Sequence, residues 1–97
     1  MTKLMFYDSN RDLAFGRAVN LFRNSRGLSS QGLSDLTDID ILRLRRIEKG
    51  VSSVKVGEIV RLARALDVST IELITIAQGI YERWEALPEP TLLRPIP

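Results

Sequence analysis

The chain of 97 residues contains no cysteine and no histidine, and aromatic residues make up only 6% of it. These absences exclude thiol and imidazole nucleophiles, Ser-His triads and the usual ligands of structural zinc. Carboxylates, lysine, serine and tyrosine remain, but we find no pair of converging carboxylates and no activated lysine among them. We therefore expect no enzymatic activity, no cofactor and no bound metal.

Long apolar runs are also missing. The longest uncharged stretch, residues 73–81, is too short to cross a bilayer, and the apolar residues 4–7 are too short for a signal peptide. The remaining composition, 44% apolar and 27% charged, is typical of one small globular domain. We expect a cytoplasmic protein without a membrane segment, and its small size favours a second subunit.

The formal net charge is only +2, but the basic residues are concentrated in the middle of the chain. Residues 41–64 contain Glu48 and Glu58 as their acidic residues, whereas the basic residues are Arg43, Arg45, Arg46, Lys49, Lys55, Arg61 and Arg64. Such a local excess is expected of a surface that binds phosphate groups. An ordinary solvated helix surface would carry the same charges, so charge alone leaves both interpretations open.

Apolar spacing predicts helices over residues 10–25, 41–49, 56–66 and 70–86, and it predicts no strand. A further short helix, which carries Leu33, is expected after the cap-type residues Ser29 and Ser30. Asp40 is a candidate N-cap, and Ser69 with Glu72 has the spacing of a capping box. Gly50 is a natural helix end, and Pro88 ends the last helix. The fold class is therefore all-α, followed by a proline-rich tail.

Two short helices joined by a tight turn and followed by basic residues are the components of a helix-turn-helix. Several segments carry a more specific pattern: Phe15-Gly16, Leu28-Ser29, Leu33, residues 47–50 (Ile-Glu-Lys-Gly), residues 61–69 (RLARALDVS) and Glu72-Leu73. Together they resemble the XRE family of lambda-repressor-like regulators over residues 13–74. The resemblance implies four segments: an N-terminal arm (1–9), a DNA-binding domain of five helices (10–74), an extension of the last helix (75–87) and a tail (88–97).

The resemblance also implies roles for individual residues. The third helix would enter the major groove of DNA, with Ile41, Leu42, Arg45 and Arg46 facing the bases. Ser30, Arg43 and Lys49 would contact phosphates. Arg23 and Glu48 would form an internal ion pair.

The chain departs from the family pattern at the predicted interface. Ile41 and Leu42 are bulky aliphatics where the family commonly has polar residues, and Leu36 occupies a site that the family usually exposes. These side chains would contact thymine methyl groups and favour A·T pairs, or else form an apolar patch that binds protein. The neighbouring arginines favour the first interpretation. Asp38 replaces the usual glycine of the turn, where a left-handed backbone is tolerable for Asp.

The last helix has an apolar stripe formed by Leu73, Ile76, Ile80 and Trp84. This stripe would form the interface of a two-fold dimer, or it would pack against Ala14, Ala18 and Leu21 of the first helix.

These observations predict a sequence-specific DNA-binding regulator, specifically a repressor that binds a palindromic operator as a homodimer. The alternative is an antitoxin that represses its own operon and binds a toxin. Trp84, Leu92 and Leu93 would then contact that protein partner.

Overall fold

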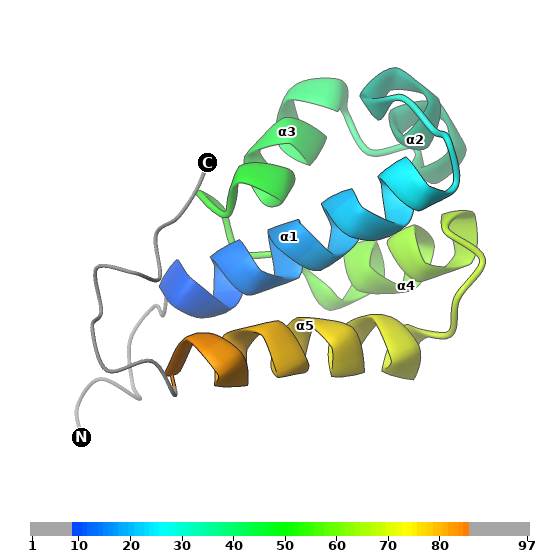
Figure 1. The fold of residues 1–97 in the computed structure, drawn as a ribbon. Helices are drawn as coiled ribbons and strands as arrows, with labels where there is room; N and C mark the ends of the chain where they lie inside the picture. The colour runs from blue at the N-terminus through cyan, green and yellow to red at the C-terminus, as the bar shows by residue number, and fades with distance from the viewer. Residues whose placement is uncertain (1–8, 86–97) are drawn as a thin grey trace.

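The computed structural model describes residues 9–85, and these residues form helices and no strand. The five helices are α1 (Ser9–Ser25), α2 (Ser30–Thr37), α3 (Ile41–Lys49), α4 (Val56–Ala65) and α5 (Thr70–Glu85) (Figure 1). The prediction of an all-α, five-helix fold is confirmed. The predicted arm lies outside the described residues except for Ser9, which begins α1, and the predicted tail lies outside them entirely.

Side-chain caps fix the starts of the helices. Ser29 Oγ accepts a hydrogen bond from the backbone N–H of Gly32 at 2.9 Å, and Asp40 Oδ2 accepts one from Leu42 at 2.9 Å. Ser69 Oγ accepts one from Glu72 at 2.9 Å, as the predicted capping box requires of its serine. The turn between α2 and α3 passes through Asp38, whose φ of 61° is left-handed as expected for this departure from glycine.

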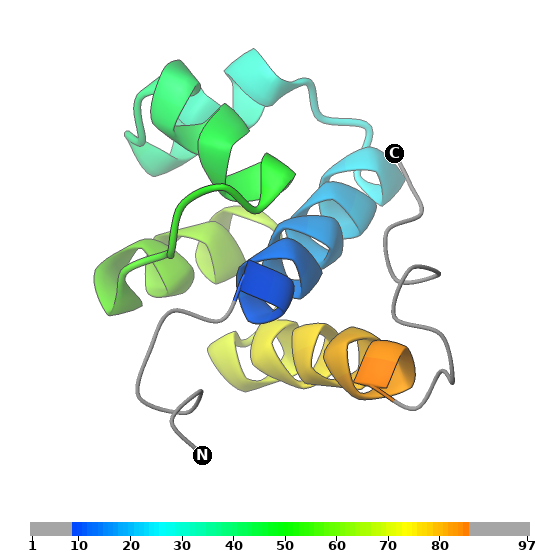
Figure 2. The same ribbon diagram turned by 90° about the vertical axis from the view of Figure 1, so that its left-hand side faces the viewer.

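The core contains apolar side chains from all five helices. The largest fully buried side chains are Val19 of α1, Leu33 and Thr37 of α2, Leu44 and Ile47 of α3, Leu62 of α4, Leu73 of α5, and Leu66, which follows α4. Figure 2 shows α1 at the centre of the bundle, with α3 on one side and α5 on the other. This arrangement leaves the opposite face of α3 on the outside of the molecule.

A close backbone contact joins α1 to the end of α3. A Cβ atom built on Gly16 would come within 2.5 Å of the carbonyl oxygen of Glu48 and still closer to that of Ile47. Gly50, which ends α3 in a left-handed conformation (φ 75°), would clash in the same way with the backbone of Leu13. The position of α3 therefore depends on glycine at both points.

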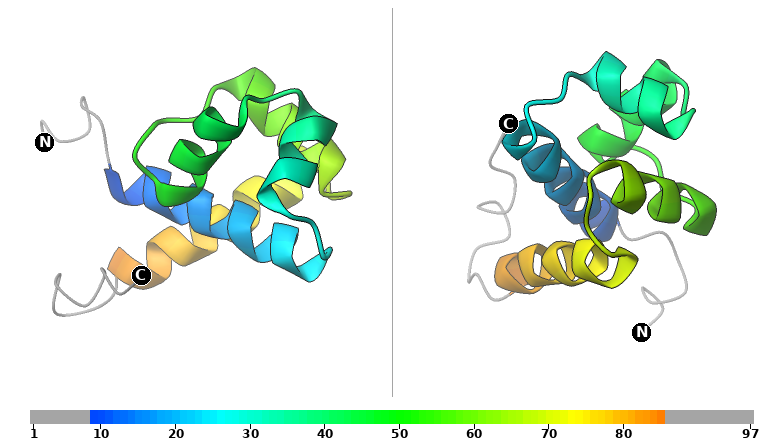
Figure 3. Two further views of the ribbon diagram at one scale, coloured as in Figure 1. Left: turned by 90° about the horizontal axis from the view of Figure 1, so that it is seen from above. Right: turned by 90° about the vertical axis from the view of Figure 1, so that its right-hand side faces the viewer.

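The apolar stripe of α5 packs only partly within its own chain, since Leu73 is buried and Ile76 is exposed. α5 runs antiparallel to α1, so that the end of α5 lies beside the start of α1 (Figures 1 and 3). Leu73 is fully buried and Ile80 packs against the core, while Ala14 and Ala18 of α1 are buried and Leu21 is 54% exposed. The prediction that Leu73 contributes to a subunit interface is wrong, because its own chain covers it completely.

Other apolar side chains of α4 and α5 remain exposed. Val56, Ile71, Ile74 and Ile76 are all exposed, and Trp84 is half-buried. Within residues 9–85, no helix combines the length and apolar character needed to span a membrane.

Candidate nucleic-acid interface

One face of α3 is exposed and carries four predicted DNA-contacting residues. Leu42, Arg45, Arg46 and Lys49 follow each other at helical spacings of three, one and three residues, which places them on a single face. All four are exposed, and Leu42 reaches 64%. The opposite face holds Leu44 and Ile47, which are buried. The amphipathic pattern of α3 thus anchors the helix by its apolar face and presents arginine and lysine outward.

The predicted thymine-contacting residues differ in their exposure. Leu42 is exposed on α3, and Leu36 is 61% exposed near the end of α2. Ile41, the first residue of α3, is half-buried.

A shallow depression of about 510 Å³ lies where α1, α2 and α3 meet. Its lining residues are Asn20, Ser30, Arg45, Glu48 and Lys49. Ser30 is the first residue of α2, whose free backbone N–H groups and positive dipole end favour an anion. Ser30 and the side chains of Arg45 and Lys49 therefore surround a space in which a phosphate oxygen can accept hydrogen bonds.

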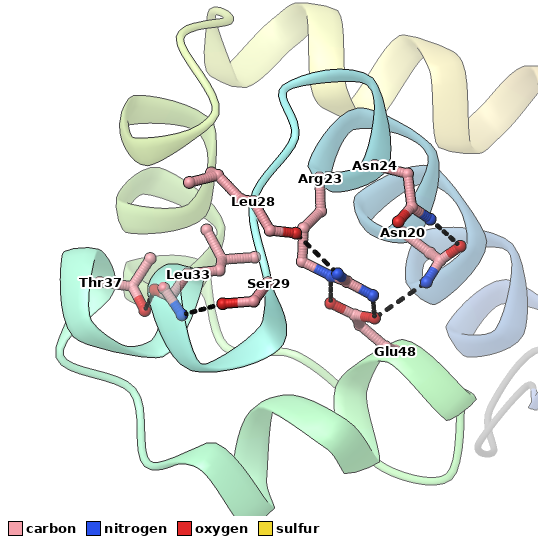
Figure 4. Close-up of polar contacts among 9 residues, drawn as sticks. Asn20, Arg23, Asn24, Leu28, Ser29, Leu33, Thr37 and Glu48 are labelled. Atoms are coloured by element: carbon pink, nitrogen blue, oxygen red, sulfur yellow. Dashed lines mark hydrogen bonds and ion pairs between the residues drawn. The ribbon is translucent and has the colours of Figure 1, made fainter.

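The internal ion pair expected of Arg23 and Glu48 is present (Figure 4). Arg23 Nε donates to Glu48 Oε2 at 2.8 Å and Nη2 donates to Oε1 at 3.1 Å, in a bidentate geometry. Arg23 Nη1 also donates to the carbonyl oxygen of Leu28 at 2.9 Å, and Asn20 Nδ2 donates to Glu48 Oε1 at 3.0 Å. This network fastens the end of α3 to α1 and to the segment that enters α2, and it occupies the Glu48 carboxylate.

Arg43 has a different environment from the one predicted. Its Nε donates to Glu58 Oε2 at 3.0 Å and its Nη2 donates to Glu58 Oε1 and to the carbonyl oxygen of Ser53, each at 2.8 Å. The side chain points toward α4 and joins α3 to it. Arg43 is therefore a structural residue, and we leave it out of the proposed phosphate contacts.

The Arg43 guanidinium lowers the pKa of Glu58 from 4.5 to about 2, mainly through these hydrogen bonds. The backbone N–H of Lys55, which donates to Glu58 Oε1 at 2.8 Å, lowers this pKa further, whereas burial of the carboxyl group opposes the shift. The same ion pair raises the pKa of Arg43. Both side chains thus stay charged at neutral pH.

No site role was assigned to Asn20, Ser52 or Glu58 from the sequence. Ser52 Oγ accepts a hydrogen bond from Arg46 Nε at 3.3 Å. Glu58 follows Lys55 by three residues, the spacing of a carboxylate that caps a helix start, and this signal could have identified it. No comparable local signal marks Asn20 or Ser52, because their partners, Glu48 and Arg46, lie on a different element, α3.

Comparison with known families identifies the family to which the chain belongs. The family model described as helix-turn-helix matches residues 20–73, more than half of the chain. The chain belongs to the XRE-type helix-turn-helix family, whose members are DNA-binding transcriptional regulators. The family and the fold are thus those of regulators and not of enzymes.

The similar proteins are also regulators. The chain is 34% identical over 56 residues to uncharacterized HTH-type transcriptional regulators of Rickettsia conorii and Rickettsia prowazekii. These matches cover 58% of the chain but only 45% and 43% of the two relatives, so the chain spans less than half of their length.

Two solved structures share the fold. The clp gene regulator ClgR from Corynebacterium glutamicum superimposes with a TM-score of 0.75 at 22% identity, over 78% of this chain and 81% of ClgR. The restriction-modification controller protein C.AhdI from Aeromonas hydrophila gives a TM-score of 0.62 at 32% identity, over 64% of this chain and 94% of C.AhdI.

Proposed function

We propose that the protein is a repressor that binds a palindromic operator as a homodimer and inserts α3, the recognition helix, into the major groove. The observation that carries this proposal is the exposed row of Leu42, Arg45, Arg46 and Lys49 on α3. An exposed helix face with two arginines and a lysine matches the acceptor-rich groove and the phosphates that border it. A repressor acts by occupying its operator, which requires no chemistry at the site.

Base recognition is assigned to both kinds of side chain on this face. A guanidinium can pair with O6 and N7 of guanine in a two-pronged contact, so Arg46 and Arg45 are the proposed guanine readers. Leu42, with Ile41 beside it and Leu36 on α2, offers apolar contact to thymine methyl groups. The proposed operator therefore combines guanine with A·T pairs in each half-site.

Phosphate binding is assigned to the depression at the start of α2. Ser30 and Lys49 line it from two helices, and the α2 N-terminus adds its backbone donors. Such contacts position the protein on the duplex without specifying sequence. With DNA as its partner, the protein would act in the cytoplasm.

Dimerisation is assigned to the exposed apolar residues of α4 and α5. The original stripe retains Ile76, together with the less exposed Ile80 and Trp84, whereas Val56 and Ile71 are 77% and 76% exposed. Several large apolar side chains on adjacent helices are more than a small monomer needs to expose. A two-fold partner on this surface would set two recognition helices about 34 Å apart, one turn of DNA.

The antitoxin alternative depended on Trp84, Leu92 and Leu93. Trp84 is half-buried, and both leucines lie outside the described residues. No observation favours this alternative over the regulator.

A selection experiment tests the proposal. Purified protein is mixed with short duplexes that have a randomised central segment, at two salt concentrations, and the retained DNA is sequenced while sedimentation reports the stoichiometry. We expect a dimer that enriches a palindrome with guanine and A·T pairs and that binds more weakly at high salt. A protein that retains no DNA, or retains it without sequence preference, contradicts the proposal.

A further inference from the structure

The loop between α3 and α4 is fixed at several points. The backbone N–H of Val51 donates to the carbonyl oxygen of Arg46 at 3.1 Å. Ser53 is held on both sides, because its carbonyl oxygen accepts from Arg43 Nη2 at 2.8 Å and its Oγ donates to Asp12 Oδ2 of α1 at 2.9 Å. Ser52 lies between these two anchored residues, so its position relative to α3 is defined by the fold.

The hydroxyl of Ser52 meets a predicted base reader. Arg46 Nε donates to Ser52 Oγ at 3.3 Å, from the exposed face of α3. Nε is the inner donor of the guanidinium group, so both terminal nitrogens remain available to a ligand. Within residues 9–85, the structure gives the neighbouring Arg45 no corresponding acceptor, although it is equally exposed and lies one residue away.

The choice of donor atoms has a consequence for recognition. A guanidinium can donate hydrogen bonds to two acceptors of a ligand either through Nε and one terminal nitrogen or through both terminal nitrogens. While Ser52 accepts from Nε, the first geometry is occupied, and the contact favours one orientation of the planar group. The remaining geometry, an end-on pair of Nη1 and Nη2, still matches the two acceptors of guanine in the major groove.

We infer that Ser52 is a positioning residue that holds the Arg46 guanidinium for end-on pairing with one guanine and thereby sets the base preference at that position. The loop anchors on α1 and α3 supply the rigidity, because a hydroxyl on a mobile loop would not restrict its partner. This inference rests on the proposed function of Arg46 as a base reader.

The test compares the base preferences of several variants, each measured by selection from the same pool of randomised duplexes. The wild type, S52A, S52T, R46A and the double variant R46A/S52A are each used for selection. We expect S52A to lose about three- to tenfold of the guanine enrichment at the position that R46A affects, as expected for one lost hydrogen bond. S52T keeps the hydroxyl and the preference, and the double variant equals R46A.

Three outcomes would overturn the inference, and they differ in whether Arg46 remains a base reader. An unchanged S52A profile beside an altered R46A profile rejects the role of Ser52 and retains Arg46 as a reader. An unchanged R46A profile rejects the base-reading role itself and the inference with it. A further loss when S52A is added to R46A shows that Ser52 contacts DNA directly. Circular dichroism and the thermal midpoint verify that each variant is folded, and R83A, at an exposed position of α5, controls for the removal of an arginine outside the proposed DNA interface.

Discussion

Arg43 of α3 and Glu58 of α4 form a bidentate ion pair, with distances of 3.0 Å from Nε to Oε2 and 2.8 Å from Nη2 to Oε1. The pair joins α3 to α4, the helix that follows it in sequence. Its carboxylate is largely buried, at 9% side-chain exposure, so the interaction is shielded from solvent more than a surface ion pair is.

This ion pair makes stability depend on pH. The pKa of Glu58 is about 2 in the folded chain and 4.5 in the reference state, so its contribution is complete above pH 4.5 and is lost as the pH falls toward 2. We expect the wild type to be more stable than E58Q by up to about 3 kcal/mol at pH 7. Urea unfolding at pH 7, 4 and 2.5 measures this difference.

The difference in the free energy of unfolding between wild type and E58Q should decrease as the pH falls from 4.5 toward 2. E72Q removes an exposed carboxylate from the start of α5 and serves as the matched control. A constant difference between wild type and E58Q from pH 7 to 2.5 would contradict the assignment of the ion pair.

The Arg23–Glu48 pair predicts strong coupling between two substitutions. The side chains are only 13% and 10% exposed, so R23A or E48A leaves a mostly buried charge without its partner. We expect each single variant to lose about 3 kcal/mol, while R23A/E48A loses less than the sum of the two. Urea unfolding of the full double-mutant cycle gives the coupling energy, and strictly additive losses would show that the pair does not act as a unit.

The contact of Gly16 with the end of α3 predicts opposite effects at two glycines. G16A forces a Cβ against the carbonyl groups of Ile47 and Glu48 and should destabilise the fold by at least about 2 kcal/mol. G79A is the matched control, because a Cβ there meets nothing within 4 Å and alanine favours the helix by about 0.5 to 1 kcal/mol. Thermal unfolding of both variants measures the effects, and similar midpoints would refute the close contact.

Lys49 is expected to act on affinity without affecting base preference. As a phosphate contact, it should contribute to selected and random duplexes alike, and K49A should reduce the slope of log affinity against log salt by about one. Titrations of both duplexes at several salt concentrations measure this. R83A, on the exposed side of α5 away from α3, is the charge control, and an unchanged slope for K49A would exclude the phosphate contact.

The thymine contact of Leu42 predicts sensitivity to a single methyl group. Replacing thymidine by deoxyuridine in the selected duplex should weaken binding by the wild type about fourfold at the contacted position, since one buried methyl contributes about 0.8 kcal/mol. The L42A variant should bind both duplexes equally. Fluorescence titration of the four combinations of protein and duplex measures the coupling between Leu42 and the methyl group. Equal losses of affinity in wild type and L42A would show that Leu42 does not contact this methyl group.

The helices and their caps were predictable because their signals are local. Asp40 and Ser69 cap as their sequence positions indicate, and the ion pair of Arg23 with Glu48 followed from the family resemblance. The role of Arg43 was not predictable from residue type, because Arg43, Arg45 and Arg46 are chemically identical. Arg43 lies one turn before the buried Ile47, at the edge that α4 approaches, and only the path of the chain after Gly50 brings Glu58 there.

The environment of the apolar residue Leu73 was likewise not predictable from the local sequence. Periodicity placed Leu73, Ile76, Ile80 and Trp84 on one face of a helix, but it could not show whether the same chain or a second copy covers that face. The answer depends on α1, a helix far earlier in the sequence, which packs against α5. Leu73 is fully buried in the core cluster to which Phe15, Ala18 and Val19 of α1 also belong.

The close contact at Gly16 also determines how the protein would adapt to its DNA. With no side chain between them at this point, the backbones of α1 and the end of α3 are in direct contact, which leaves little room for α3 to move against α1. A duplex whose groove does not fit must then bend or twist to meet it. The stiffness of base steps that no side chain touches would thereby become part of the sequence preference.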